Sequence, residues 1–131
     1  MMIDRLVYRS HAVGILPEIA LDRIFQSSVP NNARSNITGS LGYCGQSYIQ
    51  LLEGPASAID ELVGVLLADP RHTGLRILLR GFSERRLLPS WSMARVDLAK
   101  ITPEVETLLD NEDGLGLIAL MSTLAHEGMT R

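Results

Sequence analysis

Apolar and polar positions alternate in the first and the last of five short stretches that we predict to be β-strands, and a period of two is typical of strands that bury one face. The stretches are residues 3–9, 37–43, 48–52, 75–82 and 91–98. Residues 44–47 join the second stretch to the third, and Gly45 supplies the backbone angles that a tight hairpin turn needs. The pattern therefore predicts five strands, two of which pair as a hairpin.

Other stretches repeat apolar residues every three or four positions, as amphipathic helices do. The clearest one covers residues 56–69. Its apolar stripe consists of Ile59, Leu62, Val63, Leu66 and Leu67. Pro17 opens an earlier helix at the position where its missing N–H costs nothing, and we expect residues 30–32 to end that helix. Two further helices are predicted in the tail, one beginning at Pro103 and one over residues 114–128.

The predicted order is β-α-β-β-α-β-β followed by two helices, which indicates an α+β protein. The first six elements match the ferredoxin-like plan, in which two helices pack on one face of the sheet. The opposite face would then be polar, but Val7, Ile49 and Leu51 place apolar side chains there. We therefore expect the two C-terminal helices, or a second subunit, to cover that face.

Composition, charge and cysteine content narrow the functional classes. The 131 residues, of which 46% are hydrophobic and 21% charged, suit one soluble domain with one core. A net charge of −3 argues against a nucleic-acid or anionic membrane partner. One cysteine, Cys44, and three scattered histidines allow no intrachain disulfide and give no zinc-ligand spacing. No signal peptide or membrane-spanning apolar run is visible, so we expect a cytoplasmic protein.

Several polar and aromatic residues on the predicted elements need an explanation. They are Tyr8 and Gln50 on the strand face assigned to the helices, Asn31 and Asn32 at the end of the first helix, and Trp91 and Met93 at the start of the last strand. Taken singly, each is ordinary: a core tyrosine, an exposed strand glutamine, helix caps and packing residues. Together they predict a cleft between the two helices with apolar walls and amides at one end. Such a cleft suits a flat aromatic ligand, and an isoalloxazine ring fits it.

Six short pieces of sequence carry a resemblance to a known family. They are LVYRS at 6–10, NNAR at 31–34, ITGSL at 37–41, QLLEG at 50–54, DPRH at 69–72 and WSM at 91–93. In this order and spacing the chain resembles the BLUF domain, a family of blue-light sensors that use FAD. The resemblance covers residues 3–98. It implies a flavin-binding photosensor domain over residues 1–98, with residues 99–131 as a C-terminal helical extension of the same domain.

The resemblance also implies where FAD binds non-covalently, between the two helices that begin near Pro17 and Pro55. The cofactor-binding residues would be Tyr8, Ile24, Ser28, Asn31, Asn32, Ile37, Gln50, Leu66, Arg71 and His72. Asn32, with Asn31, would hold the pyrimidine edge of the flavin. Arg71 would lie near the phosphates.

Tyr8 and Gln50 would be the photoactive pair. The Tyr8 phenol can give an electron and then a proton to an excited flavin. Glutamine carries both a donor and an acceptor, so after recombination Gln50 can return rotated or tautomerised. A new hydrogen bond from Gln50 to the flavin C4 carbonyl would shift absorption to the red. Trp91 and Met93 would relay this switch toward the tail, where it biases a two-state element.

We therefore expect a signalling module, not an enzyme, which acts on a separate effector protein. The apolar second face and the amphipathic tail also predict a homo-oligomer, a dimer or higher. Two alternatives stay open. One is a small acylphosphatase-like hydrolase using Arg34 and Asn36, although no phosphate-cradling glycine loop precedes them. The other is a regulatory domain that is not photoactive and binds another small ligand.

Overall fold

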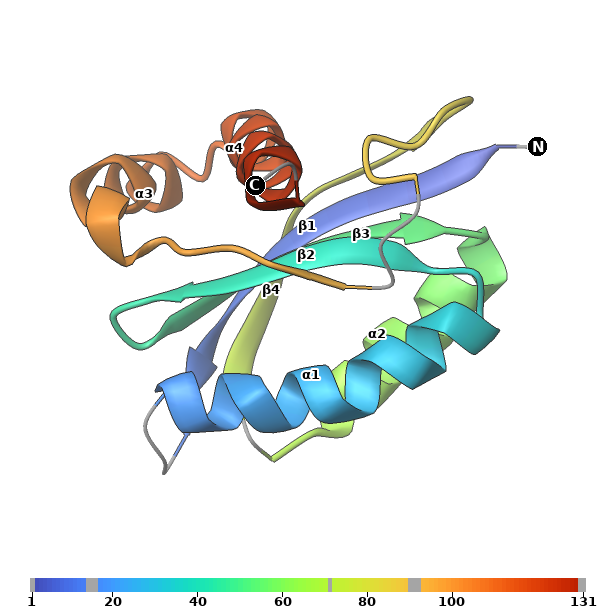
Figure 1. The fold of residues 1–131 in the computed structure, drawn as a ribbon, viewed down its shortest axis with the longest axis horizontal. Helices are drawn as coiled ribbons and strands as arrows, with labels where there is room; N and C mark the ends of the chain where they lie inside the picture. The colour runs from blue at the N-terminus through green and yellow to red at the C-terminus, as the bar shows by residue number, and fades with distance from the viewer. Residues whose placement is uncertain (1, 14–16, 71, 90–92, 130–131) are drawn as a thin grey trace.

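A five-stranded sheet with helices on both faces makes up the described part of the chain (Figure 1). The computed structural model describes residues 2–13, 17–70, 72–89 and 93–129. Its elements are β1 (Ile3–Ala12), α1 (Pro17–Arg34), β2 (Thr38–Cys44), β3 (Ser47–Gly54), α2 (Ala56–Ala68), β4 (His72–Ser83), β5 (Ala94–Arg95), a 3-10 turn (Ala99–Ile101), α3 (Thr102–Asp110) and α4 (Gly114–Met129). This order confirms the predicted α+β class.

The strands lie in the order β4-β1-β3-β2-β5, which is the ferredoxin-like order with one strand added at an edge. Strand β1 pairs antiparallel with both β3 and β4. Strands β2 and β3 form the predicted hairpin, in which Cys44 faces Ser47. Gly45 has a φ of 60° there, at the first position of a two-residue loop, where a positive φ favours glycine.

The predicted last strand, over residues 91–98, is shorter than expected. Only Ala94 and Arg95 form a ladder, parallel to β2, and residues 91 and 92 lie outside the described part. The alternation is nevertheless real: Arg95 points toward α1, whereas Ala94 and Val96 are buried on the other side. The pattern therefore predicted which side chains of this stretch are buried, but not that only two of its residues pair with β2.

Each face of the sheet carries its own apolar core. The front core, beneath α1 and α2, contains Leu6, Tyr8, Leu21, Ile24, Ile37, Leu41, Tyr48, Leu52, Ile59 and Met93. The back core, beneath α3 and α4, contains Val7, Cys44, Ile49, Leu51, Leu88, Ala94, Val96, Leu98, Val105, Leu109, Leu117, Ile118, Met121 and Ala125. The two C-terminal helices thus cover the second face, which was one of the two covers expected from the sequence. Each fully buried aliphatic side chain contributes about 1.5–3 kcal/mol to folding.

The two front helices differ from the sequence pattern in detail. Helix α1 was expected to end at residues 30–32, but it continues to Arg34 with an exposed Pro30 inside it. The last turn is closed by a local backbone hydrogen bond, in which the Ile37 N–H donates to the Asn32 carbonyl at 2.9 Å. Leu67, expected in the buried stripe of α2, is 65% exposed. Ile59 is the one fully buried residue of α2.

Candidate functional site

Gln50 lies at the centre of the front face, and it is 2% exposed. Pairing of β1 with β3 places Tyr8 directly beside it. The Tyr8 hydroxyl donates a hydrogen bond to Gln50 Oε1. On its other side, Gln50 Nε2 donates to the Met93 Sδ at 3.5 Å. The buried amide therefore bonds a phenol through its oxygen, while a weak thioether acceptor leaves its nitrogen able to donate to a ligand.

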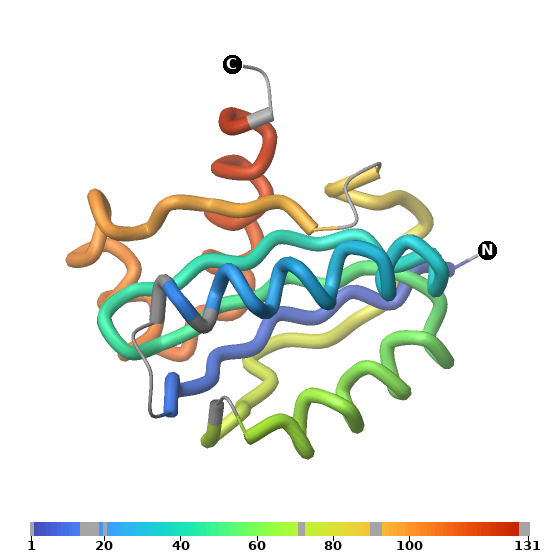
Figure 2. The backbone as a smooth tube through the Cα atoms, turned by 60° about the horizontal axis from the view of Figure 1, so that its bottom comes forward, coloured from blue at the N-terminus to red at the C-terminus, as the bar shows by residue number. Residues whose placement is uncertain are grey.

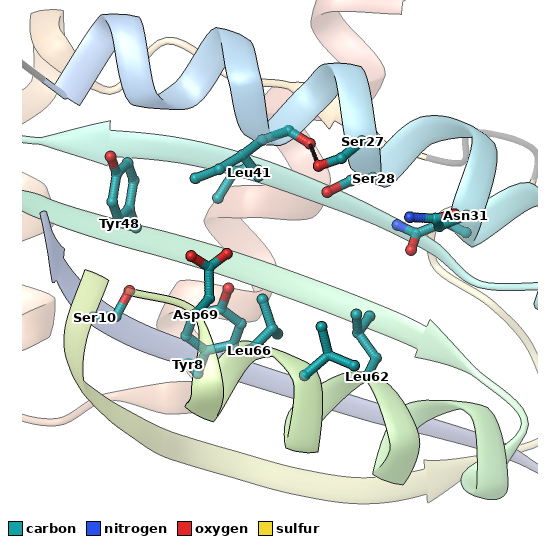
Figure 3. A pocket seen from close by; sticks show the side chains of 13 residues that line it. Tyr8, Ser10, Ser27, Ser28, Asn31, Leu41, Tyr48, Leu62, Leu66 and Asp69 are labelled. Atoms are coloured by element: carbon teal, nitrogen blue, oxygen red, sulfur yellow. Dashed lines mark hydrogen bonds between the residues drawn. The ribbon is translucent and has the colours of Figure 1, made fainter. Parts of the chain in front are cut away.

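A cleft lined by residues of α1 and α2 opens beside Tyr8. Figure 2 shows the two helices running across the same face of the sheet. The cleft is lined by Tyr8, Ser10, Ile24, Ser27, Ser28, Asn31, Asn32, Leu41, Tyr48, Leu62, Val65, Leu66 and Asp69. Helix α1 contributes hydroxyls and amides, and α2 contributes mainly aliphatic side chains (Figure 3). The site therefore combines apolar walls with a few polar groups, as sites for flat organic ligands do.

The donor set of this cleft fits a flavin ring. Ser10 is fully buried on β1, and its hydroxyl has no hydrogen-bond partner among the described residues. Buried polar atoms are nearly always satisfied, so this hydroxyl points to a ligand with a polar atom. The buried amide of Asn32 offers a donor and an acceptor that a pyrimidine edge matches, and Ile24 and Leu66 offer apolar contact.

The environment of Tyr8 keeps its phenol neutral. Burial raises the pKa of Tyr8 well above its usual value of 10.0, and the negative charge of Asp69 raises this pKa further. Tyr48 acts in the same direction. A neutral phenol carries the proton that the hydrogen bond to Gln50 uses. The site is therefore set to hold a protonated donor at this position throughout the neutral pH range.

The structure brings most of the predicted site residues together. Those lining the cleft are Tyr8, Ile24, Ser28, Asn31, Asn32 and Leu66. Gln50 is not among the lining residues; it is buried and hydrogen-bonded to Tyr8, which does line the cleft. Ile37 lines an adjoining space next to Asn31 and Asn32, and Met93 is buried beside Gln50. Asn31 is exposed, and its side-chain Oδ1 accepts a hydrogen bond from the Arg34 guanidinium. Arg71 and Trp91 lie outside the described residues, and of His72 only the backbone that begins β4 is described.

Some lining residues were not predicted as site residues. They are Ser10, Ser27, Leu41, Tyr48, Leu62, Val65 and Asp69. Ser10 lies two residues after Tyr8 on one strand, and Tyr48 lies two residues before Gln50 on another, so strand alternation could have found both. Asp69 was noted only as a helix end. Its position at the cleft depends on how α2 packs on the sheet, which the sequence pattern alone does not give.

None of the helices in the described ranges is long and apolar enough to cross a membrane. Among the same residues, no group of three or more His, Cys, Asp or Glu side chains could hold a metal ion.

The fold and the cleft define a ferredoxin-like α+β domain with a site for a flat aromatic ligand between its two front helices. Comparison with protein families gives the particular class. The model of the BLUF family, described as sensors of blue-light using FAD, matches residues 3–94. This chain belongs to the BLUF family. As a member of this family, it is a blue-light sensor domain that uses FAD, and the hydrolase alternative is not favoured.

Relatives and solved structures agree with this assignment. The blue light- and temperature-regulated antirepressor BluF of Escherichia coli is 30% identical over 97 residues, which are 74% of this chain and 24% of that protein. Photoactivated adenylate cyclase subunit beta of Euglena gracilis is 32% identical over 89 residues, 67% of this chain and 10% of that protein. The chain thus spans a quarter or less of these curated relatives.

One solved structure is similar over nearly its whole length. The dark state structure of BlrB, a BLUF protein, has a TM-score of 0.81 and 34% identity, and the match covers 95% of this chain and 96% of that one. A bacterial light-regulated adenylyl cyclase has a TM-score of 0.76 and 30% identity, but the match covers only 40% of its chain. The similarity to BlrB includes the region of the tail helices.

Proposed function

We propose that this chain senses blue light through the hydrogen bonds of Gln50 and passes the change to a separate effector protein. The single observation that carries the proposal is the buried hydrogen-bonded series Tyr8–Gln50–Met93, of which Tyr8 lines the cleft. A glutamine side chain can exchange its donor and acceptor ends, so this series has two stable arrangements. A sensor requires such a bistable element.

The residues of the chain define what each arrangement contains. Bound FAD supplies blue-light absorption and, when excited, a strong oxidant. Tyr8 offers an electron and a proton, and its proton lies on the hydrogen bond to Gln50 Oε1. If the Gln50 amide reverses, its nitrogen faces the Tyr8 oxygen, and its oxygen faces the Met93 sulfur. Tyr8 then becomes an acceptor, and Met93 loses its N–H partner.

The same cleft supports the binding roles. We infer that Asn32, with Asn31, holds the pyrimidine edge, and that Ile24, Ile37 and Leu66 flank the ring. Asn32 is 2% exposed, so its amide is held in one place within the site. Ser28 and the region of Arg71 and His72 would lie around the rest of the cofactor.

The test is the absorption spectrum of the purified protein loaded with FAD. We expect oxidised-flavin absorption that moves several nanometres to the red under blue light and returns in darkness. The Gln50→Leu variant should stay yellow and lose the shift, and Tyr8→Phe should do the same. Gln46→Leu, in the exposed hairpin loop, is the matched control and should shift normally. A normal shift in Gln50→Leu, or a protein that binds no FAD, would overturn the proposal.

We also propose the chain organisation, with residues 1–98 as the photosensor and residues 99–131 as an extension of the same domain. The shared back core supports this, because Val105, Leu117 and Met121 of the tail pack with sheet residues. The effector would be a separate cytoplasmic protein. The names of relatives, which include an antirepressor and adenylate cyclases, support an effector of regulatory kind without identifying it.

A homo-oligomer is proposed on a different surface from the one first expected. The tail covers the back face of the sheet, so that face is not free to bind a second copy. Strand β4 lies at the edge of the sheet and exposes Ile77, Leu79 and Phe82, the last to 63%. Open edges with apolar side chains favour self-association. Phe82→Ser should lower the mass measured by light scattering at a given concentration, and an unchanged mass would contradict the use of this edge.

A further inference from the structure

Glu53 is a completely buried carboxylate that lies outside the cleft. Its Oε2 accepts hydrogen bonds from Arg5 Nε at 2.8 Å and from the Leu87 backbone N–H at 2.9 Å. Its Oε1 accepts from the Leu88 backbone N–H at 2.7 Å. A buried charge persists only where partners of this kind satisfy it. Two of the three donors come from one short stretch of backbone, the segment of residues 84–89 that follows β4.

A second side chain fixes the same segment to the sheet. The Arg86 guanidinium donates to the Glu53 carbonyl at 3.1 Å and to the Thr38 hydroxyl at 2.9 Å. It also donates to the Asn36 carbonyl at 2.8 Å. Leu88, two residues after Arg86, is fully buried in the back core. The 84–89 segment has no regular secondary structure, yet side chains hold it firmly against the ends of β2 and β3.

The tail helix contacts this segment from the other side. The Leu87 carbonyl accepts a hydrogen bond from His126 Nε2 of α4 at 2.7 Å. Because a carbonyl can only accept, His126 Nε2 is the nitrogen that carries the proton. The Leu87 residue is therefore bonded in two directions. Its N–H is tied to β3 through Glu53, and its C=O is tied to the last turns of α4.

The same stretch of chain leads to the photoactive pair. Met93 follows Leu88 by five positions, and its sulfur accepts from Gln50 Nε2. Glu53 follows Gln50 by three positions on β3. Strand β3 thus bonds Leu87 through a carboxylate and Met93 through the amide that is expected to switch.

We propose that Glu53 is a positioning residue for the light response, and that the Leu87–His126 hydrogen bond couples the Gln50 site to α4. The inference rests on the proposed function. When the Gln50 amide reverses, Met93 loses its N–H partner and shifts. Gln50 and Glu53 lie on the same strand, so the rearrangement also reaches the Leu87 peptide through Glu53 and weakens its bond to His126. The last turns of α4 then loosen from the sheet, which presents a changed surface to an effector.

Hydrogen exchange measured by mass spectrometry on the full chain with FAD, in darkness and under blue light, tests this coupling. The flavin absorption is recorded on the same samples. In the wild type we expect the red shift together with faster exchange at residues 120–128 in the light. In Glu53→Gln the red shift should persist, and the light-minus-dark difference at residues 120–128 should vanish. Glu84→Gln, exposed in the same segment, should behave as the wild type.

A second variant keeps the test valid if Glu53→Gln does not fold. His126 is exposed, so His126→Ala leaves both cores intact. It should keep the red shift, raise exchange at residues 120–128 in darkness and lose the light-induced difference there. A light-induced difference retained in His126→Ala, or a wild type that shifts normally without any change in α4, would overturn the coupling. A wild type without a red shift would instead overturn the proposed function, and with it the coupling.

Discussion

Tyr8 holds its proton into the alkaline range because it is buried beside Asp69. Its folded pKa is higher than its unfolded pKa of about 10. The unfolded chain therefore binds fewer protons than the folded chain above that pH, and stability falls as pH rises. Below about pH 10 both states keep the proton, so the contribution of Tyr8 to stability is fully present there.

This predicts a pH dependence specific to Tyr8. Between about pH 9 and about pH 11, the free energy of unfolding of the wild type should fall more steeply than that of Tyr8→Phe, by at most about 1.4 kcal/mol per pH unit above the unfolded pKa. Urea unfolding at several pH values measures the two slopes. Tyr43→Phe, which changes a less buried tyrosine, should keep the wild-type slope. Equal slopes for wild type and Tyr8→Phe would show that Tyr8 is not held neutral by the fold.

At the residue scale, the sequence predicted contacts that strand pairing alone can create. Tyr8 and Gln50 meet because β1 and β3 are antiparallel neighbours in one register, and both lie on the expected face. Contacts between elements without such a register were not predictable. Asp69 reaches the cleft only through the packing of α2, and Glu53 finds its donors in a segment with no periodic pattern.

At the scale of elements, the differences from prediction have physical causes. Proline is a strong helix breaker in isolation, but α1 continues past Pro30, and backbone hydrogen bonds from the Ser35 and Ile37 N–H groups close its last turn. The consequence is functional, since this last turn places Asn32 in the cleft. The stretch after Met93 is extended and half-buried, yet it forms few ladder bonds with β2. The sequence pattern thus predicted that helix α1 and the last strand exist, but it did not predict where either of them ends.

The packing of the 93–98 stretch on β2 gives a prediction for Gly42. A Cβ there would lie 2.8 Å from the Val96 carbonyl oxygen and 3.0 Å from Leu98 Cδ1. Gly42→Ala should therefore destabilise the protein by about 1–3 kcal/mol, because the backbone of the neighbouring stretch must move. Urea unfolding measures the change in unfolding free energy.

The matched control is Gly64→Ala in α2, where a Cβ would meet nothing within 4 Å. Alanine is favoured over glycine inside a helix, so this variant should be more stable by roughly 0.5–1 kcal/mol. If both variants changed stability by the same amount and sign, the cost would not come from contact with the 93–98 stretch.

At the scale of the whole molecule, one sheet separates two cores with different tasks. The front core surrounds Tyr8 and Gln50, and the back core joins the sheet to the tail. The sequence indicated this division, because Val7, Ile49 and Leu51 were too apolar to face water. It could not choose between the tail and a second copy as the cover, since both offer an apolar surface. The structure resolves this: α3 and α4 cover the back face of their own sheet.

If the tail belongs to the same folding unit, a substitution in the middle of α4 should destabilise the flavin site as well. Met121 is fully buried in the back core, and its carbonyl accepts a hydrogen bond from the Ser40 hydroxyl at 3.4 Å. Met121→Ala should cost about 2–5 kcal/mol. Leu115→Ala, on the same helix but 71% exposed, should change stability by less than about 0.5 kcal/mol.

Urea unfolding followed by far-ultraviolet circular dichroism and by flavin release should give coincident transitions in both variants. A Met121→Ala protein that lost its tail structure at low urea while holding FAD would show that the tail is a separate unit, joined to the sensor more loosely than the shared core implies.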